Sequence, residues 1–201
     1  MCGVCDICRN PGVGNKETEE MIKTERTDLR PFDEGDLAFL NSLYSDPVIM
    51  KYMPFDLEDM EASKEHLDRM IRDWKADPVM NHEFVVVERK SGEKIARCHI
   101  QIDTDTDTGM IGWLILVDRW NMGYATEITK ELIRYSFDEL GLHRVNALCN
   151  PENIRSRKVL EKFMRLEAHY IQKVRYVKGG ATSWEDELEY ALLKEEYMKK
   201  K

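Results

Sequence analysis

Apolar residues follow two different spacings along the chain, and the clearest change of spacing lies near its middle. Residues 110–117 form a continuous apolar run rich in β-branched side chains, which predicts a buried strand. After a short polar interval, Ala125, Ile128 and Leu132 recur at helical spacing until Gly141, a residue that suits a helix C-terminus. The centre of the chain is therefore predicted to be a strand, a short loop and a helix.

The same reasoning divides most of the chain into strands and helices. Strands are predicted at 27–31, 83–88, 94–103, 110–117, 144–149, 166–177 and 183–193. Helices are predicted at 33–44, 47–53 and 56–77, after the loop that follows Val117, and from Asn153 through Phe163, with 195–201 as a frayed tail. This succession predicts an α/β fold with one mixed sheet of about seven strands.

Composition adds limits to this picture. A chain of 201 residues with 42% hydrophobic content can bury one sizeable core, so we expect a single domain at 24–197 after a flexible extension at 1–23. No apolar run approaches the ~20 residues that cross a bilayer, and 1–15 lacks the apolar stretch of a secretory signal. We therefore expect a cytoplasmic protein without a membrane partner. The net charge of −8 argues against general nucleic-acid binding.

The extension carries three cysteines, Cys2, Cys5 and Cys8, at a spacing that could hold zinc or an iron–sulfur cluster. Tetrahedral zinc needs four ligands, and the remaining cysteines, Cys98 and Cys149, fall in predicted strands far along the chain. Reduced surface thiols are the preferred interpretation, and no metal site is predicted.

The loop after the central strand suits an anion. The first backbone N–H groups of a helix have no intrahelical partner, and the helix dipole adds positive potential there. Gly123 supplies the one position without a Cβ atom. By itself this pattern leaves two interpretations open, an anion site or a tight turn. The strand predicted at 144–149 runs into Asn150-Pro151-Glu152-Asn153 and a further helix, which gives a second strand–loop–helix unit.

The residues of both loops resemble a known family. Trp120-Asn121-Met122-Gly123-Tyr124-Ala125-Thr126-Glu127 resembles the acetyl-CoA pyrophosphate loop of the GNAT superfamily, and more narrowly that of the RimJ/RimL-like ribosomal-protein N-acetyltransferase branch. The second signature of that branch is matched by Asn153, Ser156 and Leu160-Glu161-Lys162. Thr24 to Pro31 near the start, and Trp184-Glu185-Asp186 with Tyr190 near the end, extend the resemblance over about residues 22 to 197.

The resemblance implies a GNAT-like acyltransferase fold in which the fourth and fifth strands, ending at Val117 and Cys149, splay apart. It also implies acetyl-CoA as cosubstrate, with its pantetheine arm in the opening. The residues expected to bind it are Leu116 and Val117 for the pantetheine, Trp120, Asn121, Met122, Gly123, Tyr124, Ala125 and Thr126 for the diphosphate, and Asn153 for the CoA chain. Asn121-Met122 stands where a Gly-Lys pair is usual, which removes one flexible residue and one cation near the phosphates.

The implied reaction is direct attack of a neutral amine on the thioester, without a covalent enzyme intermediate. It needs a group that removes a proton and a group that protonates the departing thiolate. The tyrosine that many GNAT enzymes use for the thiolate is replaced here by Leu160, so Ser156 is the predicted catalytic donor. A role of Ser156 in capping its helix is the alternative.

The general base stays open in the sequence. The candidates are His99, Glu83, Glu88 and a chain of water molecules. Cys149 lies beside the expected thioester, but no His/Asp arrangement is available to activate it as a nucleophile.

Charge is distributed unevenly, which bears on the acceptor. Residues 141–178 hold nine Lys/Arg and three acids, whereas 56–77 hold eight acids and four Lys/Arg. The pattern fits a polyanionic donor on one side and a cationic amine on the other, or simply two solvated faces. The predicted acceptor is a protein N-terminal α-amine, which with a pKa of ~8 is already about a tenth neutral at pH 7. The alternatives are a small cationic amine, such as an aminoglycoside or polyamine, and a non-catalytic CoA-binding module; a homodimer stays open.

Overall fold

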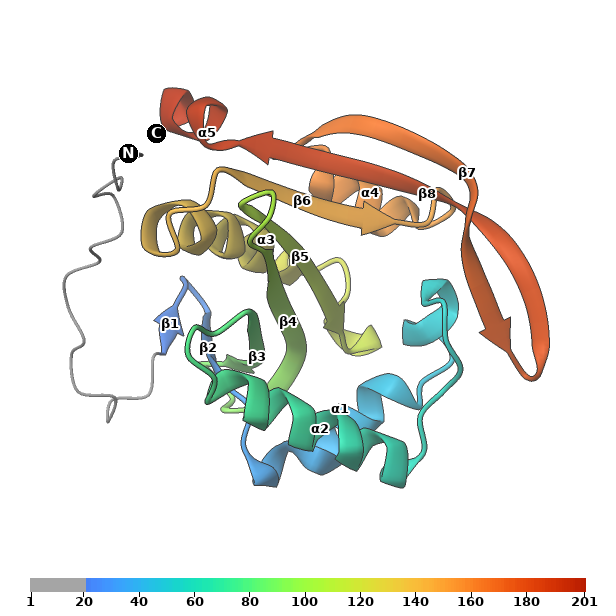
Figure 1. Cartoon of the computed structure of the whole chain (residues 1–201). Helices are drawn as coiled ribbons and strands as arrows, with labels where there is room; N and C mark the ends of the chain where they lie inside the picture. Colours follow the sequence, from blue (N-terminus) through green and yellow to red (C-terminus); the bar gives the residue numbers. More distant parts are fainter. Residues whose placement is uncertain (1–20) are drawn as a thin grey trace, which may run out of the picture.

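The computed structural model describes residues 21–201, which form one mixed sheet with helices on both faces (Figure 1). The strands are β1 (Ile22–Lys23), β2 (Thr27–Pro31), β3 (Asn81–Glu88), β4 (Lys94–Asp103), β5 (Thr108–Ile115), β6 (Arg144–Cys149), β7 (Arg165–Lys178) and β8 (Ala181–Leu193). Their order in the sheet is β1-β2-β3-β4-β5-β6-β8-β7. Among the strands of residues 21–201, only β5 and β6 pair in parallel; all other neighbours are antiparallel.

The helices lie in two layers. They are η1 (Glu34–Asp36), α1 (Leu37–Tyr44), η2 (Ile49–Tyr52), α2 (Met60–Trp74), η3 (Val117–Arg119), α3 (Tyr124–Arg134), the π-helix η4 (Tyr135–Glu139), α4 (Ile154–Leu160) and α5 (Lys194–Lys200). Alternate residues of the strands face the two layers, because successive side chains of a strand point to opposite sides. Phe84 of β3 packs in the same buried cluster as Ile128 of α3, whereas its neighbour Val85 packs with Leu40 of α1 and Leu67 of α2.

The seven strands predicted from the sequence are present, and β1 is an eighth. Ile22 of β1 is buried and pairs with Leu29, so the sheet begins ahead of the domain boundary expected at residue 24. Residues 1–20, with Cys2, Cys5 and Cys8, lie outside the described part of the chain. Within residues 21–201, no helix is long and apolar enough to cross a membrane.

The expectation of a frayed tail at 195–201 is wrong, because α5 packs on the rest of the domain. Tyr197 stacks on Phe137 with ring centroids 5.0 Å apart, and its hydroxyl donates to Asp138 at 3.0 Å. Glu196 forms an ion pair with Arg165. These partners are distant in sequence, so the local pattern of charges could not predict them.

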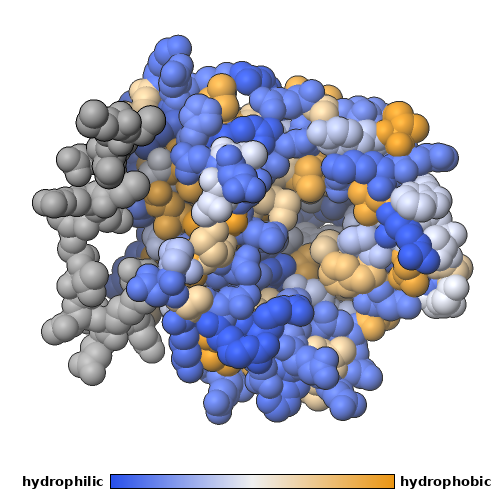
Figure 2. Space-filling model, viewed as in Figure 1, coloured by the Kyte–Doolittle hydropathy of each residue, from blue (hydrophilic) through white to orange (hydrophobic). Residues whose placement is uncertain are grey.

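The opening predicted between the fourth and fifth strands is present between β5 and β6. Their pairing consists of Thr108 with Arg144, Gly109 with Val145 and Met110 with Asn146, and it ends there. β5 nevertheless continues to Ile115 and β6 to Cys149. The strands diverge toward η3 and α4 in Figure 1, and Figure 2 shows the surface of this face hollowed between the ends of β5 and β6 and the segment of η2.

Candidate active site

The register of β4 and β5 determines which backbone groups face the opening. Opposite residues in an antiparallel pair alternate between bonded and non-bonded positions. The amide of Leu116 donates to the carbonyl of Ile95 at 3.0 Å, so the next residue back, Ile115, points its own N–H and C=O away from β4. By the same alternation Ile111 and Trp113 also face away from β4, but the parallel pairing of Met110 with Asn146 is made through Gly109 and Ile111. The peptide groups of Trp113 and the N–H of Ile115 are therefore the ones that point into the opening. They provide an unpaired strand edge to which an extended amide-containing chain can bind.

Of the two residues expected to bind the pantetheine, Leu116 and Val117, only Val117 has an amide that is left for it. The Leu116 amide is committed to β4, whereas the Val117 amide has no protein acceptor among the described residues. The carbonyl of Ile115 accepts the indole Nε1–H of Trp120 at 2.8 Å, which fixes that ring beside the opening. The alternation pattern of the sequence places 110–117 in a strand, but only the register shows that Trp113, and not Leu116, turns its peptide groups to the opening.

The loop from η3 to α3 presents a row of backbone N–H groups. Asn121 (φ 61°) and Gly123 (φ 87°) both adopt left-handed conformations, which Asn tolerates and Gly accepts freely. The Trp120 amide donates to the carbonyl of Val117. Among residues 21–201, no protein acceptor is present for the amides of Asn121, Met122, Gly123, Tyr124, Ala125 and Thr126. Such a row at a helix N-terminus can bind a diphosphate.

Residues at the start of the fold hold this loop in place. Arg26 donates from Nη1 to the carbonyl of Met122 at 2.9 Å and from Nε to Glu127 at 2.7 Å, and its guanidinium lies 4.3 Å from the centroid of the Tyr124 ring. The carboxylate of Glu127 also accepts from the Thr24 hydroxyl and the Arg26 amide. Burial opposes ionisation of Glu127, but these hydrogen bonds outweigh it and keep the Glu127 pKa below its usual value. In the sequence Arg26 and Glu127 belong to two separate motifs, so their contact could not be predicted from it.

Two cations from the segment after β6 reach the same loop. Lys162 donates from Nζ to the hydroxyl of Thr126 at 3.0 Å, and the Arg155 guanidinium lies 4.7 Å from the centroid of the Trp120 ring. Arg144, in contrast, is paired with Glu167 and Glu189. Part of the positive segment predicted at 141–178 thus surrounds the loop, and these side chains offer the cations that the Asn121-Met122 pair lacks.

The helix α4 brings Asn153 and Ser156 together at its first turn. Asn153 is the N-cap, and its Oδ1 accepts from the backbone N–H of Ser156 at 3.2 Å. The capping contact therefore uses the Ser156 amide, while the Ser156 hydroxyl and the Asn153 Nδ2 have no protein partner among the described residues. Leu160 is 1% exposed in the core and contributes only packing.

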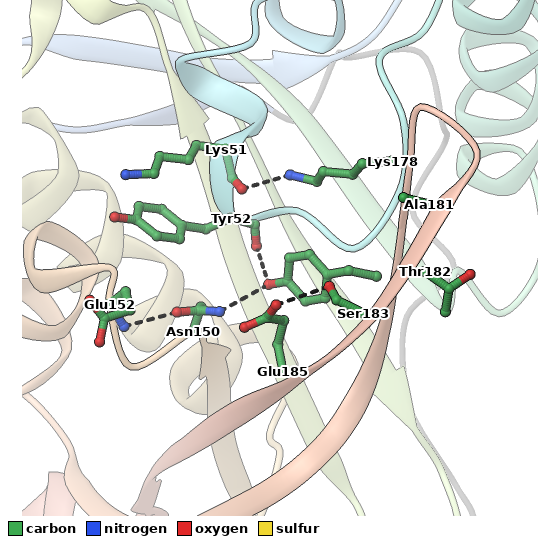
Figure 3. Close-up of a pocket in the computed structure, with 10 residues that line it drawn as sticks. Lys51, Tyr52, Asn150, Glu152, Lys178, Ala181, Thr182, Ser183 and Glu185 are labelled. Carbon is green, nitrogen blue, oxygen red and sulfur yellow. Dashed lines mark hydrogen bonds between the residues drawn. The ribbon is translucent and has the colours of Figure 1, made fainter.

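A cavity of about 300 Å³ lies beside the opening (Figure 3). Its walls come from η2, the loop after β6 and the β7–β8 hairpin, and include Lys51, Tyr52, Glu152, Tyr176, Lys178 and Glu185. The hydroxyl of Tyr176 donates to the carbonyl of Tyr52 at 2.7 Å. Both acidic and basic side chains line it. Sequence reasoning did not assign a role to these residues, because their elements are far apart in the chain.

The candidate bases differ in what they contact. Glu83 is paired with the buried guanidinium of Arg97, and Glu88 accepts from Ser91 and Tyr124, whose hydrogen bonds lower the Glu88 pKa. Burial raises the pKa of the Cys149 thiol to about 11, so Cys149 is protonated at neutral pH and is a poor nucleophile. Both carboxylates are therefore already engaged by donors of the protein.

A mixed sheet that opens between two parallel strands, above a helix N-terminus with unpaired amides, is the architecture of a CoA-dependent acyltransferase. Comparison with known proteins agrees. The family model described as "Acetyltransferase (GNAT) domain" matches residues 26–163. The chain is 33% identical over 177 residues to the uncharacterized N-acetyltransferase YnaD of Bacillus subtilis (strain 168), which covers 88% of this chain and 98% of that protein.

Solved structures give the same result. A GNAT-family acetyltransferase from Bacillus anthracis superposes with a TM-score of 0.75 at 30% identity, covering 88% of this chain and 99% of that one. Spermidine N-acetyltransferase from Vibrio cholerae, in complex with CoA and spermine, superposes with a TM-score of 0.74 at 20% identity, covering 86% and 98%. The chain belongs to the GNAT acetyltransferase family. It is an N-acetyltransferase, and its acyl donor is acetyl-CoA.

Proposed function

We propose that this acetyltransferase acts on the α-amine of a protein N-terminus, in the manner of the RimJ/RimL-like branch. Acetyl-CoA lies along β5, with its pantetheine amides on the peptide groups of Trp113 and Ile115 and on the Val117 amide. The diphosphate binds the amides of 121–126, and Asn153 donates from Nδ2 to the CoA chain. The single observation that supports this placement is the coincidence of the strand opening with a row of amides that lack protein acceptors.

The cavity supports a peptide N-terminus as acceptor. Glu152 and Glu185 can attract an ammonium group, whereas Lys51 can donate to a peptide carbonyl. This mixture of charges suits a zwitterion-like end of a chain, with a cationic amine followed by acceptor carbonyls. A polyamine offers only cations, so lysines in the wall would repel it.

The Ser156 hydroxyl is the proposed donor to the departing thiolate. It lies one turn into α4 and is not used by the cap. A hydrogen bond to a developing anion is worth more in the transition state than in the ground state, so it lowers the barrier. Asn153 has a double role in this scheme, because its Oδ1 orients the first turn of α4 and its Nδ2 binds CoA.

A small cationic amine is the second candidate. It is favoured by the two carboxylates in the cavity wall and by the fold that the chain shares with a spermidine N-acetyltransferase. At 20% identity that likeness concerns the fold alone.

An amine screen distinguishes these acceptors. The protein is incubated with acetyl-CoA and either N-terminal peptides, spermidine or an aminoglycoside, and products are identified by mass. We expect the peptides to be acetylated at the α-amine, with the same peptides blocked by an N-terminal formyl group as the matched control. Preference for spermidine or the aminoglycoside would mean that the acceptor is a small amine. CoA binding without turnover on any amine would indicate a non-catalytic module.

A further inference from the structure

His99 on β4 lies against a residue of β5 that has no side chain. The residue is Gly112, which is opposite His99 in the register. A Cβ atom on Gly112 would lie 2.4 Å from His99 Cε1, 3.1 Å from Nε2 and 3.2 Å from Nδ1. Real Cβ atoms do not approach other atoms so closely, so the imidazole can extend across β5 only because glycine occupies this position.

Gly112 lies at the fork of the opening. Pairing of β5 with β6 ends at Met110, two residues earlier on the same face of the strand. The Ile111 N–H, on one side of Gly112, belongs to the last pairing with β6, whereas the Trp113 peptide groups on the other side point into the gap. The ring of His99 therefore lies over Gly112 on the face covered by α1 and α2, next to the point where the opening begins.

The two nitrogen atoms of His99 differ in their surroundings. Nδ1 is enclosed and has no hydrogen-bond partner among the described protein atoms, whereas Nε2 is not among the enclosed atoms. Burial, followed by the positive charges of Arg97 and His66, lowers the pKa of His99 well below its ordinary value. The ring is therefore neutral at physiological pH and keeps a lone pair.

The charged groups packed around the His99 ring pair with one another and not with the ring. Arg97 on β4 is paired with Glu83 of β3, and Glu58 contacts His66 of α2. β5 contributes no charge here, because Gly112 and Leu114 line its side. None of these groups forms a hydrogen bond to His99, so no carboxylate fixes the imidazole in a charged form.

We propose that His99 is the general base of the acetyl transfer, accepting the proton of the attacking amine through Nε2, directly or through one water molecule. The proposal rests on acetyl transfer to an amine, whichever amine is the acceptor. The amine nitrogen forms a bond to the thioester carbonyl carbon, and His99 takes the proton that the nitrogen must lose. The C–S bond then breaks and its electron pair leaves on the CoA sulfur. The thiolate takes up one proton and His99 releases one to solvent, so the products are an amide and free CoA thiol.

The first test is His99→Gln, which keeps a polar side chain of similar length without a basic nitrogen. We expect kcat to fall by roughly 10²-fold, the usual size of a lost general base, while the KM for acetyl-CoA stays within about twofold. The matched control is His82→Gln, at a buried histidine of β3 that packs with Trp74, Phe84 and Tyr135. It should leave kcat unchanged. An unaltered kcat in His99→Gln would overturn the proposal.

The second test separates base catalysis from packing. In His99→Ala, added imidazole should raise kcat at least tenfold. The pH dependence of the rescued rate should show an apparent pKa near that of free imidazole. A packing defect would lower the melting temperature and would not respond to imidazole, so absence of rescue in a folded variant counts against the proposal.

A third measurement does not require turnover. In a spectrum of 13C-labelled histidine, the Cε1–H signal that His99→Gln removes should shift when acetyl-CoA is added, and the His82 signal should not. A His99 signal that stays in place would mean that the ring does not face the acyl group. An error in the acceptor alone would instead appear as a different preferred amine for the wild type, with the contrast between wild type and His99→Gln intact.

Discussion

Gly123 joins the strand opening to helix α3 through a backbone conformation that other residues seldom adopt. Its φ is 87°, and a Cβ atom would lie 3.3 Å from Nη2 of Arg26. Gly123→Ala should therefore destabilise the fold by about 1 kcal/mol and displace the loop amides. We expect a lower midpoint in urea unfolding and a weaker Kd for CoA by calorimetry. Gly92→Ala, at φ 73° with no neighbour within 4 Å, is the control: it should lose similar stability but bind CoA normally.

The Ser156 hydroxyl can be tested independently of the cap, because Asn153 contacts the Ser156 amide rather than its side chain. Ser156→Ala should lower kcat by roughly 10- to 100-fold, the value of a hydrogen bond to a charged group, and leave the CoA Kd and the melting temperature unchanged. Stopped assays of thiol release, with calorimetric binding alongside, provide both values. An unchanged kcat would remove Ser156 from the mechanism.

At the scale of elements, the pair of Arg26 and Glu127 joins the start of β2 to the first turn of α3. The Glu127 pKa is lowered in the folded protein, so the stabilisation from this carboxylate is present above the unfolded pKa of about 4.3 and is lost as the pH falls through the lower folded value. We expect the difference in unfolding free energy between wild type and Glu127→Gln to be constant above about pH 5.5 and to shrink below pH 4.3. Urea titrations of both proteins above and below this pH range measure it. A difference that grows on acidification would contradict the assignment.

Strands and helices could be predicted from the sequence where a single local pattern of apolar residues determines them. The apolar run at 110–117 and the periodic residues after Gly123 gave β5 and α3 with small errors at their ends. Register was not predictable, because the alternation of side chains does not say which peptide groups are bonded to a neighbour. For that reason Leu116 was expected at the opening where Trp113 lies, and His99 could not be distinguished from Glu83 and Glu88. The cavity also escaped prediction, since Tyr52 and Tyr176 meet only in the folded chain.

At the scale of the whole molecule, the β7–β8 hairpin is attached to the segment that follows α1, more than 120 positions away. Lys178 donates from Nζ to the carbonyls of Met50 and Lys51 at 3.0 and 2.6 Å, and the Gly179 amide donates to Asp56 Oδ1 at 2.7 Å. The Val177 amide donates to the carbonyl of Pro54 at 3.1 Å. Figure 1 shows the hairpin curving down to this segment. These contacts close the domain around the cavity that we propose for the acceptor, and they hold the β7–β8 hairpin to the segment after α1.

Tyr176 is the contact of this attachment that also lines the cavity. Its hydroxyl donates to the Tyr52 carbonyl at 2.7 Å and lies 3.4 Å from Asn150 Nδ2, and burial raises its pKa. Tyr176→Phe removes one net hydrogen bond of about 1 kcal/mol from the cavity wall, so the KM for the acceptor should rise roughly fivefold while the KM for acetyl-CoA is unchanged. Tyr170→Phe is the matched control, because the Tyr170 hydroxyl donates to Glu189 on the same hairpin outside the cavity. Steady-state kinetics with each substrate varied in turn measures both constants. Equal effects of the two substitutions on the acceptor KM would mean that the hairpin contributes stability alone and that the acceptor binds elsewhere.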